Sequence, residues 1–239
     1  MINSIICLFK LIVIFCGLGY QAIIFRLFRK QNEKDQYEYV SKCANKYAWR
    51  LIRAPKCRVK IIGRENVPEG GIVFIANHQS YFDIPLLAGA YGHAIGYVAK
   101  KESKVPIIST WAIEMKSIFI DRDDIKKSIE VMNIGIQNLK KGYPMAIFPE
   151  GHRSKTGEIA EFKKGSLRLG TKSGVPIVPV VIKGSRNIFE ANKLPDKIKK
   201  VDVTLCFLEP ICYNDLSKED QKNITSIVEN RIKEKFYSI

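Results

Sequence analysis

The feature that most constrains the fold is a regular alternation, from residue 57 onward, of short apolar segments with segments of helical periodicity. The apolar segments are rich in Ile, Val and Phe, as buried strands are. Strands that alternate with helices predict an α/β fold with a largely parallel central sheet flanked by helices. The expected strands are 58–62, 72–76, 95–99, 117–120, 145–148, 177–182 and 201–208, and the expected helices are 84–91, 106–114, 124–141, 163–173 and a last one capped by Ser217 and Asp220.

Two of the expected helices have an apolar face that can be read residue by residue. In the helix predicted over 33–53, which ends before Pro55, the apolar positions are Tyr37, Val40, Ala44, Tyr47 and Leu51. In the helix predicted over 124–141, which Gly142 closes, the residues expected to face inward are Ile125, Ile129, Met132, Ile136 and Leu139.

Residues 2–28 are rich in Ile, Leu and Phe, but Lys10 interrupts them. The apolar run from Leu11 to Phe25 is shorter than the roughly 20 residues that cross a bilayer. A signal peptide is disfavoured, because no charged start precedes the apolar region 2–28 and no small-x-small cleavage site stands at a suitable place. A single spanning helix with a snorkelling Lys10 and a helix that lies in one leaflet fit equally well.

We therefore expect two parts, an N-terminal membrane-binding helical hairpin over 1–55 and an α/β domain over 56–239. Arg26, Arg29 and Lys30 follow the apolar run, and positive flanks favour the cytoplasmic side of a membrane. The expected location is the cytoplasmic face of the cell membrane.

The chain of 239 residues carries a net charge of +15, which indicates a negatively charged partner. An anionic membrane surface and a phosphorylated substrate both fit. A nucleic acid is not expected, because no DNA- or RNA-binding motif accompanies the charge. The 6 cysteines form no CxxC pair, and the 3 histidines are scattered. We expect free thiols, no structural metal and no cofactor.

A candidate catalytic pair follows the strand expected at 72–76. His78 comes directly after this strand, and Asp83 stands five positions later, at the start of the next expected helix, where Pro85 suits the first turn. On one regular helix the two side chains would lie about 140° apart, so they meet only if the chain turns between them. Asp83 would then accept a hydrogen bond from one imidazole nitrogen and leave the other free to take a proton.

Cations follow three other expected strands. They are Lys100 and Lys101 after 95–99, Arg122 after 117–120, and Arg153 after 145–148. In parallel sheets, ligands bind beyond the carboxyl ends of the strands. Several cations at that edge, close to a base, predict a substrate that carries phosphate.

Four blocks in order resemble the lysophospholipid acyltransferase superfamily, most closely the bacterial 1-acylglycerol-3-phosphate acyltransferases. The blocks are Asn77-His78-Gln79-Ser80-Tyr81-Phe82-Asp83, Ile118-Phe119-Ile120-Asp121-Arg122, Phe148-Pro149-Glu150-Gly151-His152-Arg153-Ser154 and Val175-Pro176-Ile177-Val178-Pro179-Val180. A lone HxxxxD is a weak signal, whereas four blocks with family-like spacing are a strong one. The resemblance covers roughly residues 57–210 and implies the glycerolipid acyltransferase fold.

The resemblance implies transfer of a fatty acyl group from acyl-CoA or acyl-acyl carrier protein to the sn-2 hydroxyl of 1-acylglycerol-3-phosphate, which gives phosphatidic acid. His78 would be the general base and Asp83 its orienting group, without a covalent acyl-enzyme. By the same resemblance, Lys100 and Arg153 would hold the phosphate, Arg122 would support the site, and Glu150 and Gly151 would shape the glycerol pocket.

The chain departs from the family pattern at three places, all of which bear on acceptor choice. Lys116 and Ser117 stand where a glycine usually precedes the second block, His152 replaces a common Ser or Thr, and Ser103 replaces a common leucine. Two alternatives stay open. One is an acyltransferase of the same family with another lysolipid or acceptor, and the other is a non-catalytic basic membrane-binding protein.

Overall fold

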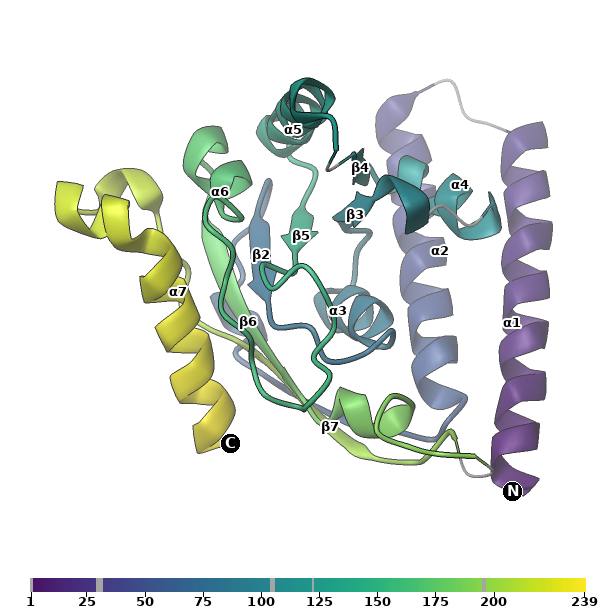
Figure 1. Cartoon of the computed structure of the whole chain (residues 1–239). Coiled ribbons are helices and arrows are strands. Elements are labelled where there is room, and N and C mark those ends of the chain that lie inside the picture. The colour runs from purple at the N-terminus through teal and green to yellow at the C-terminus, as the bar shows by residue number, and fades with distance from the viewer. Residues whose placement is uncertain (1, 29–31, 104–105, 122, 195–196) are drawn as a thin grey trace.

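The computed structural model describes residues 2–28, 32–103, 106–121, 123–194 and 197–239. Its centre is a 7-stranded sheet in the order β1-β7-β6-β2-β5-β3-β4 (Figure 1). From β6 to β4 neighbouring strands are parallel, whereas β7 is antiparallel to β6 and β1 is parallel to β7. The largely parallel sheet expected from the sequence is confirmed. The strands are β1 Arg58–Ile62, β2 Val73–Ala76, β3 Gly96–Lys100, β4 Ile118–Ile120, β5 Met145–Ile147, β6 Ile177–Lys183 and β7 Asp202–Phe207.

Helices cover both faces of this sheet, as the wholly apolar central strands require. The helices are α1 Ile2–Leu27, α2 Glu33–Arg53, α3 Asp83–Tyr91, α4 Pro106–Glu114, α5 Ile125–Lys140, α6 Arg168–Ser173 and α7 Lys218–Ser238. Strand β2 shows the two cores directly: Phe74 and Ala76 pack with residues of α2 and α3, while Val73 and Ile75 pack with residues of α5, α6 and α7. In Figure 1, α5, α6 and α7 accordingly lie on one side of the sheet and α2 and α3 on the other.

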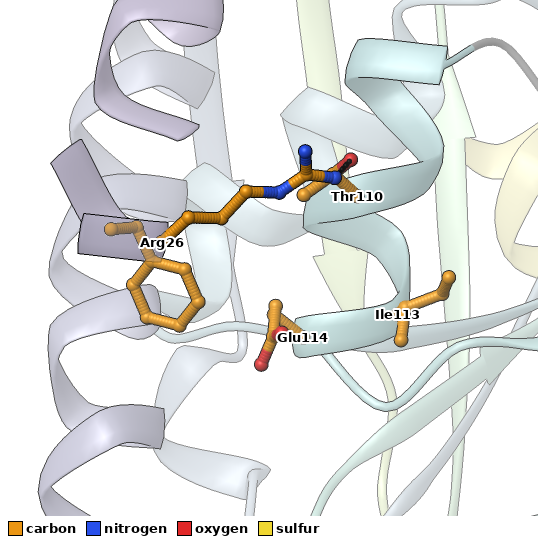
Figure 2. Close-up of a pocket in the computed structure, with 5 residues that line it drawn as sticks. Arg26, Thr110, Ile113 and Glu114 are labelled. Carbon is orange, nitrogen blue, oxygen red and sulfur yellow. Dashed lines mark hydrogen bonds between the residues drawn. The ribbon is translucent and has the colours of Figure 1, made fainter. Parts of the chain in front are cut away.

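The N-terminal helix α1 lies beside α2 and α4 at the outer side of the molecule (Figure 1). Near its C-terminal end the ring of Phe25 lies 5.9 Å from that of Tyr39 on α2 and 6.0 Å from that of Trp111 on α4. Most other apolar side chains of α1 are exposed, and Ser4–Leu27 is long and apolar enough to cross a membrane. A cavity of about 300 Å³ between α1 and α4 is lined by Phe25, Arg26, Thr110, Ile113 and Glu114 (Figure 2).

Helix α2 belongs to the α/β core as well as to the N-terminal pair of helices. Its Trp49 and Ile52 pack against Gly89 of α3, where a Cβ atom would lie 3.3 Å from each of them. A side chain at position 89 would therefore require Trp49 and Ile52 to shift by a few tenths of an ångström. The division of the chain into 1–55 and 56–239 stays a prediction.

Two details of the expected helices are wrong. The helix expected over 163–173 is confined to α6, because Gly165 has a φ of 78° and the chain makes turns before Arg168. Left-handed backbone of this kind breaks a right-handed helix. In α5, Ile129 is 41% exposed although its spacing predicts an inward position. Buried apolar side chains of α5 stand further along the helix, at Ile136 and Leu139, where Gly135 faces Ile118 of β4.

The turn before β4 uses a lysine in a conformation that favours glycine. Lys116 has a φ of 66°, and its carbonyl oxygen would lie 2.7 Å from a Cβ atom at Gly96. Its ammonium group lies 2.8 Å from Oε1 of Glu33 on α2 and 4.9 Å from the centre of the Tyr143 ring. The backbone turn is thus kept without the usual glycine, and the side chain ties the edge of the sheet to α2.

Candidate active site

The candidate site lies at the carboxyl edge of the parallel strands, in the loop between β2 and α3. The loop begins at Asn77, whose buried amide accepts a hydrogen bond from the Ile182 N–H group and donates one to the Ile182 carbonyl, both 2.8 Å long. These two bonds fix the start of the loop to the neighbouring strand β6. His78 is therefore presented from a rigid position.

Nδ1 of His78 lies 2.8 Å from Oδ2 of Asp83, which is fully buried at the first position of α3. The same oxygen accepts hydrogen bonds from the backbone N–H groups of Gln79 at 2.6 Å and Ser80 at 2.8 Å. Oδ1 accepts one from the Ser185 hydroxyl at 2.6 Å. Since an ionised carboxylate only accepts, Nδ1 carries the proton, and the lone pair of the imidazole is on Nε2.

The imidazole ring of His78 stacks on an aromatic ring. The ring centres of His78 and Phe148 are 4.0 Å apart with planes 14° from parallel, and the Tyr97 ring also stacks with Phe148, with ring centres 6.2 Å apart. The His78 side chain remains 16% exposed. In the described part of the chain, Nε2 has no hydrogen-bond partner, so it is free to accept a proton.

Glu150 joins the third block to the first. Its carboxylate is 1% exposed and accepts the backbone N–H groups of His78 at 2.6 Å and Ala160 at 2.9 Å. Burial raises the pKa of Glu150, although these two hydrogen bonds and nearby His78 oppose the shift. The carboxylate thus positions the His78 backbone, and its contribution to a glycerol pocket stays a prediction. Gly151, with a φ of 74°, makes the left-handed turn after it.

Arg153 lies in the same loop and rests on the first block. Its guanidinium carbon is 3.5 Å from the centre of the Tyr81 ring, and its Nη1 is 3.4 Å from Oε1 of Glu190. The next residue, Ser154, donates its backbone N–H to the His78 carbonyl at 2.8 Å. A cation is therefore held next to the loop that carries the candidate base.

The structure brings together four of the predicted substrate or catalytic side chains, namely His78, Asp83, Glu150 and Arg153. Lys100 is exposed at the end of β3, and within the described ranges it has no hydrogen bond or ion pair to this group. Arg122 lies outside the described residues. His152 is exposed, and its Nδ1 lies 3.3 Å from the Arg153 carbonyl, while the side chain of Ser103 is also outside the description.

Sequence reasoning missed Ser185 and Glu190, which follow β6. The available signal was the one used for the other strands: 177–182 was expected to end at the same edge, and Ser185 and Glu190 come soon after it. Ser80, in contrast, has no side-chain hydrogen bond to His78 within the described residues. Its hydroxyl donates to Glu190 at 2.6 Å and accepts from the Phe82 N–H at 3.1 Å.

Among the residues that the structure describes, no group of three His, Cys, Asp or Glu side chains is arranged to hold a metal ion. All six cysteines are free. The candidate site thus contains an imidazole with an unpaired Nε2, at His78, and a partly exposed guanidinium, at Arg153.

The structure combines a sheet that has helices on both faces, a His–Asp pair after the central strand β2 and an arginine after the adjacent strand β5. Together these features define a class of protein. The family model described as Acyltransferase matches residues 58–183, which is more than half of the chain. The chain belongs to this acyltransferase family.

Individual relatives indicate which members of the family the chain resembles. The chain is 36% identical over 165 residues to a 1-acyl-sn-glycerol-3-phosphate acyltransferase of Saccharomyces cerevisiae, covering 67% of this chain and 54% of that protein. It is 28% identical to a probable 1-acyl-sn-glycerol-3-phosphate acyltransferase of Mycoplasma genitalium, covering 83% and 81%. The chain thus spans about half the length of the yeast relative and most of the bacterial one.

A solved structure resembles nearly the whole chain. The crystal structure of the 1-acyl-sn-glycerophosphate (LPA) acyltransferase PlsC from Thermotoga maritima superimposes with a TM-score of 0.83 at 28% sequence identity. The match covers 99% of this chain and 95% of the other. The N-terminal helices α1 and α2 are therefore part of the shared architecture.

Proposed function

We propose that the protein transfers a fatty acyl group from an acyl thioester to the sn-2 hydroxyl of 1-acylglycerol-3-phosphate, giving phosphatidic acid. One observation carries the proposal: the loop that anchors Arg153 is hydrogen-bonded to the backbone of His78, whose Nδ1 is held by Asp83. The candidate base and the candidate phosphate-binding cation thus belong to two loops that are hydrogen-bonded to each other. The names of the yeast, mycoplasma and Thermotoga relatives support this choice of acceptor.

In the proposed reaction, Nε2 of His78 removes the proton from the acceptor hydroxyl as its oxygen attacks the thioester carbonyl. Asp83 keeps the proton on Nδ1 and stabilises the imidazolium that forms. The tetrahedral intermediate then collapses, the C–S bond breaks, and the imidazolium returns a proton to the departing thiolate. This reaction balances without a covalent acyl-enzyme. The Ser80 hydroxyl, which lies in the same loop, is hydrogen-bonded to Glu190 rather than to His78.

Arg153 would bind the phosphate of the acceptor. A guanidinium presents five N–H donors in a planar fork that matches phosphate oxygens. Lys100 and Arg122 would add positive charge from the neighbouring strand ends, and Gly151 would allow the close approach of the glycerol. No metal or other cofactor is needed for this reaction, since the thioester is already activated.

The proposed location is the cytoplasmic face of a cell membrane. Helix α1 exposes many large apolar side chains and could either cross the bilayer or lie in one leaflet. The net charge of +15 favours an anionic surface. The lipid acceptor and its product would then stay in the membrane while acyl-CoA or acyl-acyl carrier protein arrives from the cytoplasm.

The decisive experiment is an assay of the purified protein with a panel of lysolipids and both donor types. Lysophosphatidic acid should be acylated at the sn-2 position, and lysolipids whose phosphate carries a further headgroup should be poorer acceptors. Preferred turnover of such a lysolipid would support an acyltransferase with another acceptor. Absence of transfer with every pair would contradict the enzymatic function.

A further inference from the structure

Glu190 lies at the rim of the candidate site, and its carboxylate has no role in the proposed reaction. It lies just after the 3₁₀ helix Ser185–Ile188, which follows β6, and its side chain is only 14% exposed. Oε2 accepts a hydrogen bond from the Ser80 hydroxyl at 2.6 Å, and Oε1 accepts one from the Tyr81 backbone N–H at 2.8 Å. A carboxylate from the β6 segment thus binds the loop that carries His78.

The same carboxylate reaches the candidate phosphate-binding arginine. Oε1 of Glu190 lies 3.4 Å from Nη1 of Arg153, and the guanidinium stacks 3.5 Å from the centre of the Tyr81 ring. Glu190 therefore fixes both the backbone of the residue on which the guanidinium rests and one edge of the guanidinium itself. Glu190 thus contributes, together with the Tyr81 ring, to the placement of Arg153 relative to the loop of His78.

The contacts of Glu190 differ in length, which indicates what it holds most tightly. Those with Ser80 and Tyr81 are short, whereas that with Arg153 is near the outer limit of a hydrogen bond. Within the described residues, no other hydrogen bond or ion pair engages the Arg153 guanidinium, whose side chain is 33% exposed. Most of its donors thus remain available for the oxygens of an anionic headgroup.

We propose that Glu190 is a positioning residue for acceptor recognition, which holds Arg153 on Tyr81 so that a bound phosphate lies at a fixed distance from Nε2 of His78. This inference rests on the proposed function, because it assumes that Arg153 binds the acceptor phosphate. Glu190 touches neither the substrate nor the reacting atoms. Its effect is exerted through Arg153 and Tyr81.

The test is steady-state kinetics of Glu190→Ala and Glu190→Asp with lysophosphatidic acid, together with equilibrium binding of the non-reactive 2-deoxy analogue. Glu190→Ala should raise KM and the analogue Kd roughly tenfold, as loss of a charge-assisted hydrogen bond does, with a smaller change in kcat. Glu190→Asp keeps the charge but has a shorter reach, so its KM should fall in between. Glu209→Ala removes an exposed carboxylate after β7 and is the matched control.

A double-mutant cycle separates positioning from general stability. In an Arg153→Ala background, Glu190→Ala should add little to KM, because the residue through which it acts is gone. Equal KM and analogue Kd in wild type and Glu190→Ala would overturn the inference, as would a loss confined to kcat. If Glu190→Ala does not fold, a wild-type KM in Glu190→Asp overturns it instead. Failure of the wild type itself to acylate lysophosphatidic acid would mark failure of the proposed function.

Discussion

Oδ2 of Asp83 accepts a hydrogen bond from Nδ1 of His78 at 2.8 Å. The backbone N–H groups of Gln79 and Ser80, in the loop between these two residues, donate to the same oxygen. The loop therefore folds around the carboxylate that its histidine needs. Ser185 occupies the second oxygen at 2.6 Å and ties the pair to the segment after β6. Because every partner of Asp83 is a fixed donor, the orientation of the imidazole is set before any substrate binds.

Replacement of His78 by alanine should remove acyl transfer and leave the fold intact. A general base contributes about 10²- to 10⁴-fold to the rate, and the His78 side chain is outside the apolar core. The measurement is turnover of lysophosphatidic acid by purified protein, with thermal unfolding as the check on folding. His93→Ala, at an exposed histidine after α3, is the control. Near-normal turnover in His78→Ala would refute the mechanism.

Replacement of Arg153 by alanine should act mainly on acceptor binding. A phosphate contact that is made in both the ground state and the transition state raises KM when it is lost and changes kcat little. The expected increase in KM is about 10- to 100-fold, from hydrogen bonds to a charged group. Arg153→Lys should recover only part of it, since an ammonium lacks the planar fork. Initial rates over a range of lysophosphatidic acid concentrations measure KM, and an unchanged KM would exclude a phosphate-binding role for Arg153.

Glu150 should make stability depend on pH in a direction opposite to that of an ordinary paired carboxylate. Burial raises its pKa above 4.5, so the folded protein binds the proton more tightly than the unfolded chain does. The stability that this group contributes is present below the unfolded pKa and is lost as pH rises through the folded pKa.

Glu150→Gln removes this titration but leaves one amide N–H group facing a backbone donor. The free energy of unfolding of wild type minus that of the variant should therefore fall as pH rises above 4.5, by about 1.4 kcal/mol for each unit by which the pKa is raised. Urea unfolding in detergent at several pH values measures it. A difference that is constant with pH would show that Glu150 does not titrate differently in the folded state.

The sheet and the candidate His78–Asp83 pair could be predicted because each depends on short stretches of sequence. Apolar runs such as 72–76 can only be buried strands in this pattern, and parallel strands bring their carboxyl ends to one edge. The positions of His78 and Arg153 follow from that rule, and that of Asp83 follows from the turn expected before the next helix. Ser185 and Glu190 obey the same rule after β6, yet a serine and a glutamate carry no signal until their partners are known.

Other features depend on contacts between distant segments and could not be read from one sequence. The burial of the Glu150 carboxylate requires the backbone of Ala160 to return beneath the His78 loop. The exposure of Ile129 depends on which turns of α5 pack against the sheet. The left-handed conformation of Lys116 is an instance in which a local preference is overruled by packing against Gly96.

Substitution of Lys116 tests directly whether its left-handed backbone conformation is strained. A side chain in the left-handed region costs about 1–2 kcal/mol, a cost that glycine avoids. Lys116→Ala and Lys116→Gly both lose the ion pair to Glu33, but only the glycine variant relieves the strain. Lys116→Gly should therefore be more stable than Lys116→Ala by about 1 kcal/mol. Denaturant unfolding of both variants measures the difference, and an alanine variant of equal or greater stability would show that the turn is unstrained.

Helix α1 should bind the membrane through its exposed apolar face, which can be altered without disturbing its packing. Deletion of the helix would also uncover Tyr39 and Trp111, which pack on Phe25, so substitution is the cleaner test. Phe9 is 67% exposed and Ile12 is 52% exposed. Aspartate at either position would cost about 2.5–3.5 kcal/mol near the centre of a membrane helix.

The double variant Phe9→Asp, Ile12→Asp should therefore move from the floating to the soluble fraction when mixed with vesicles that contain anionic phospholipid. Asn223→Asp with Asn230→Asp adds the same charge on exposed positions of α7 and should still float. If both variants float equally, membrane attachment depends on another surface. If both are released, the net positive charge rather than the apolar face of α1 holds the protein on the membrane, because only charge is common to the two pairs.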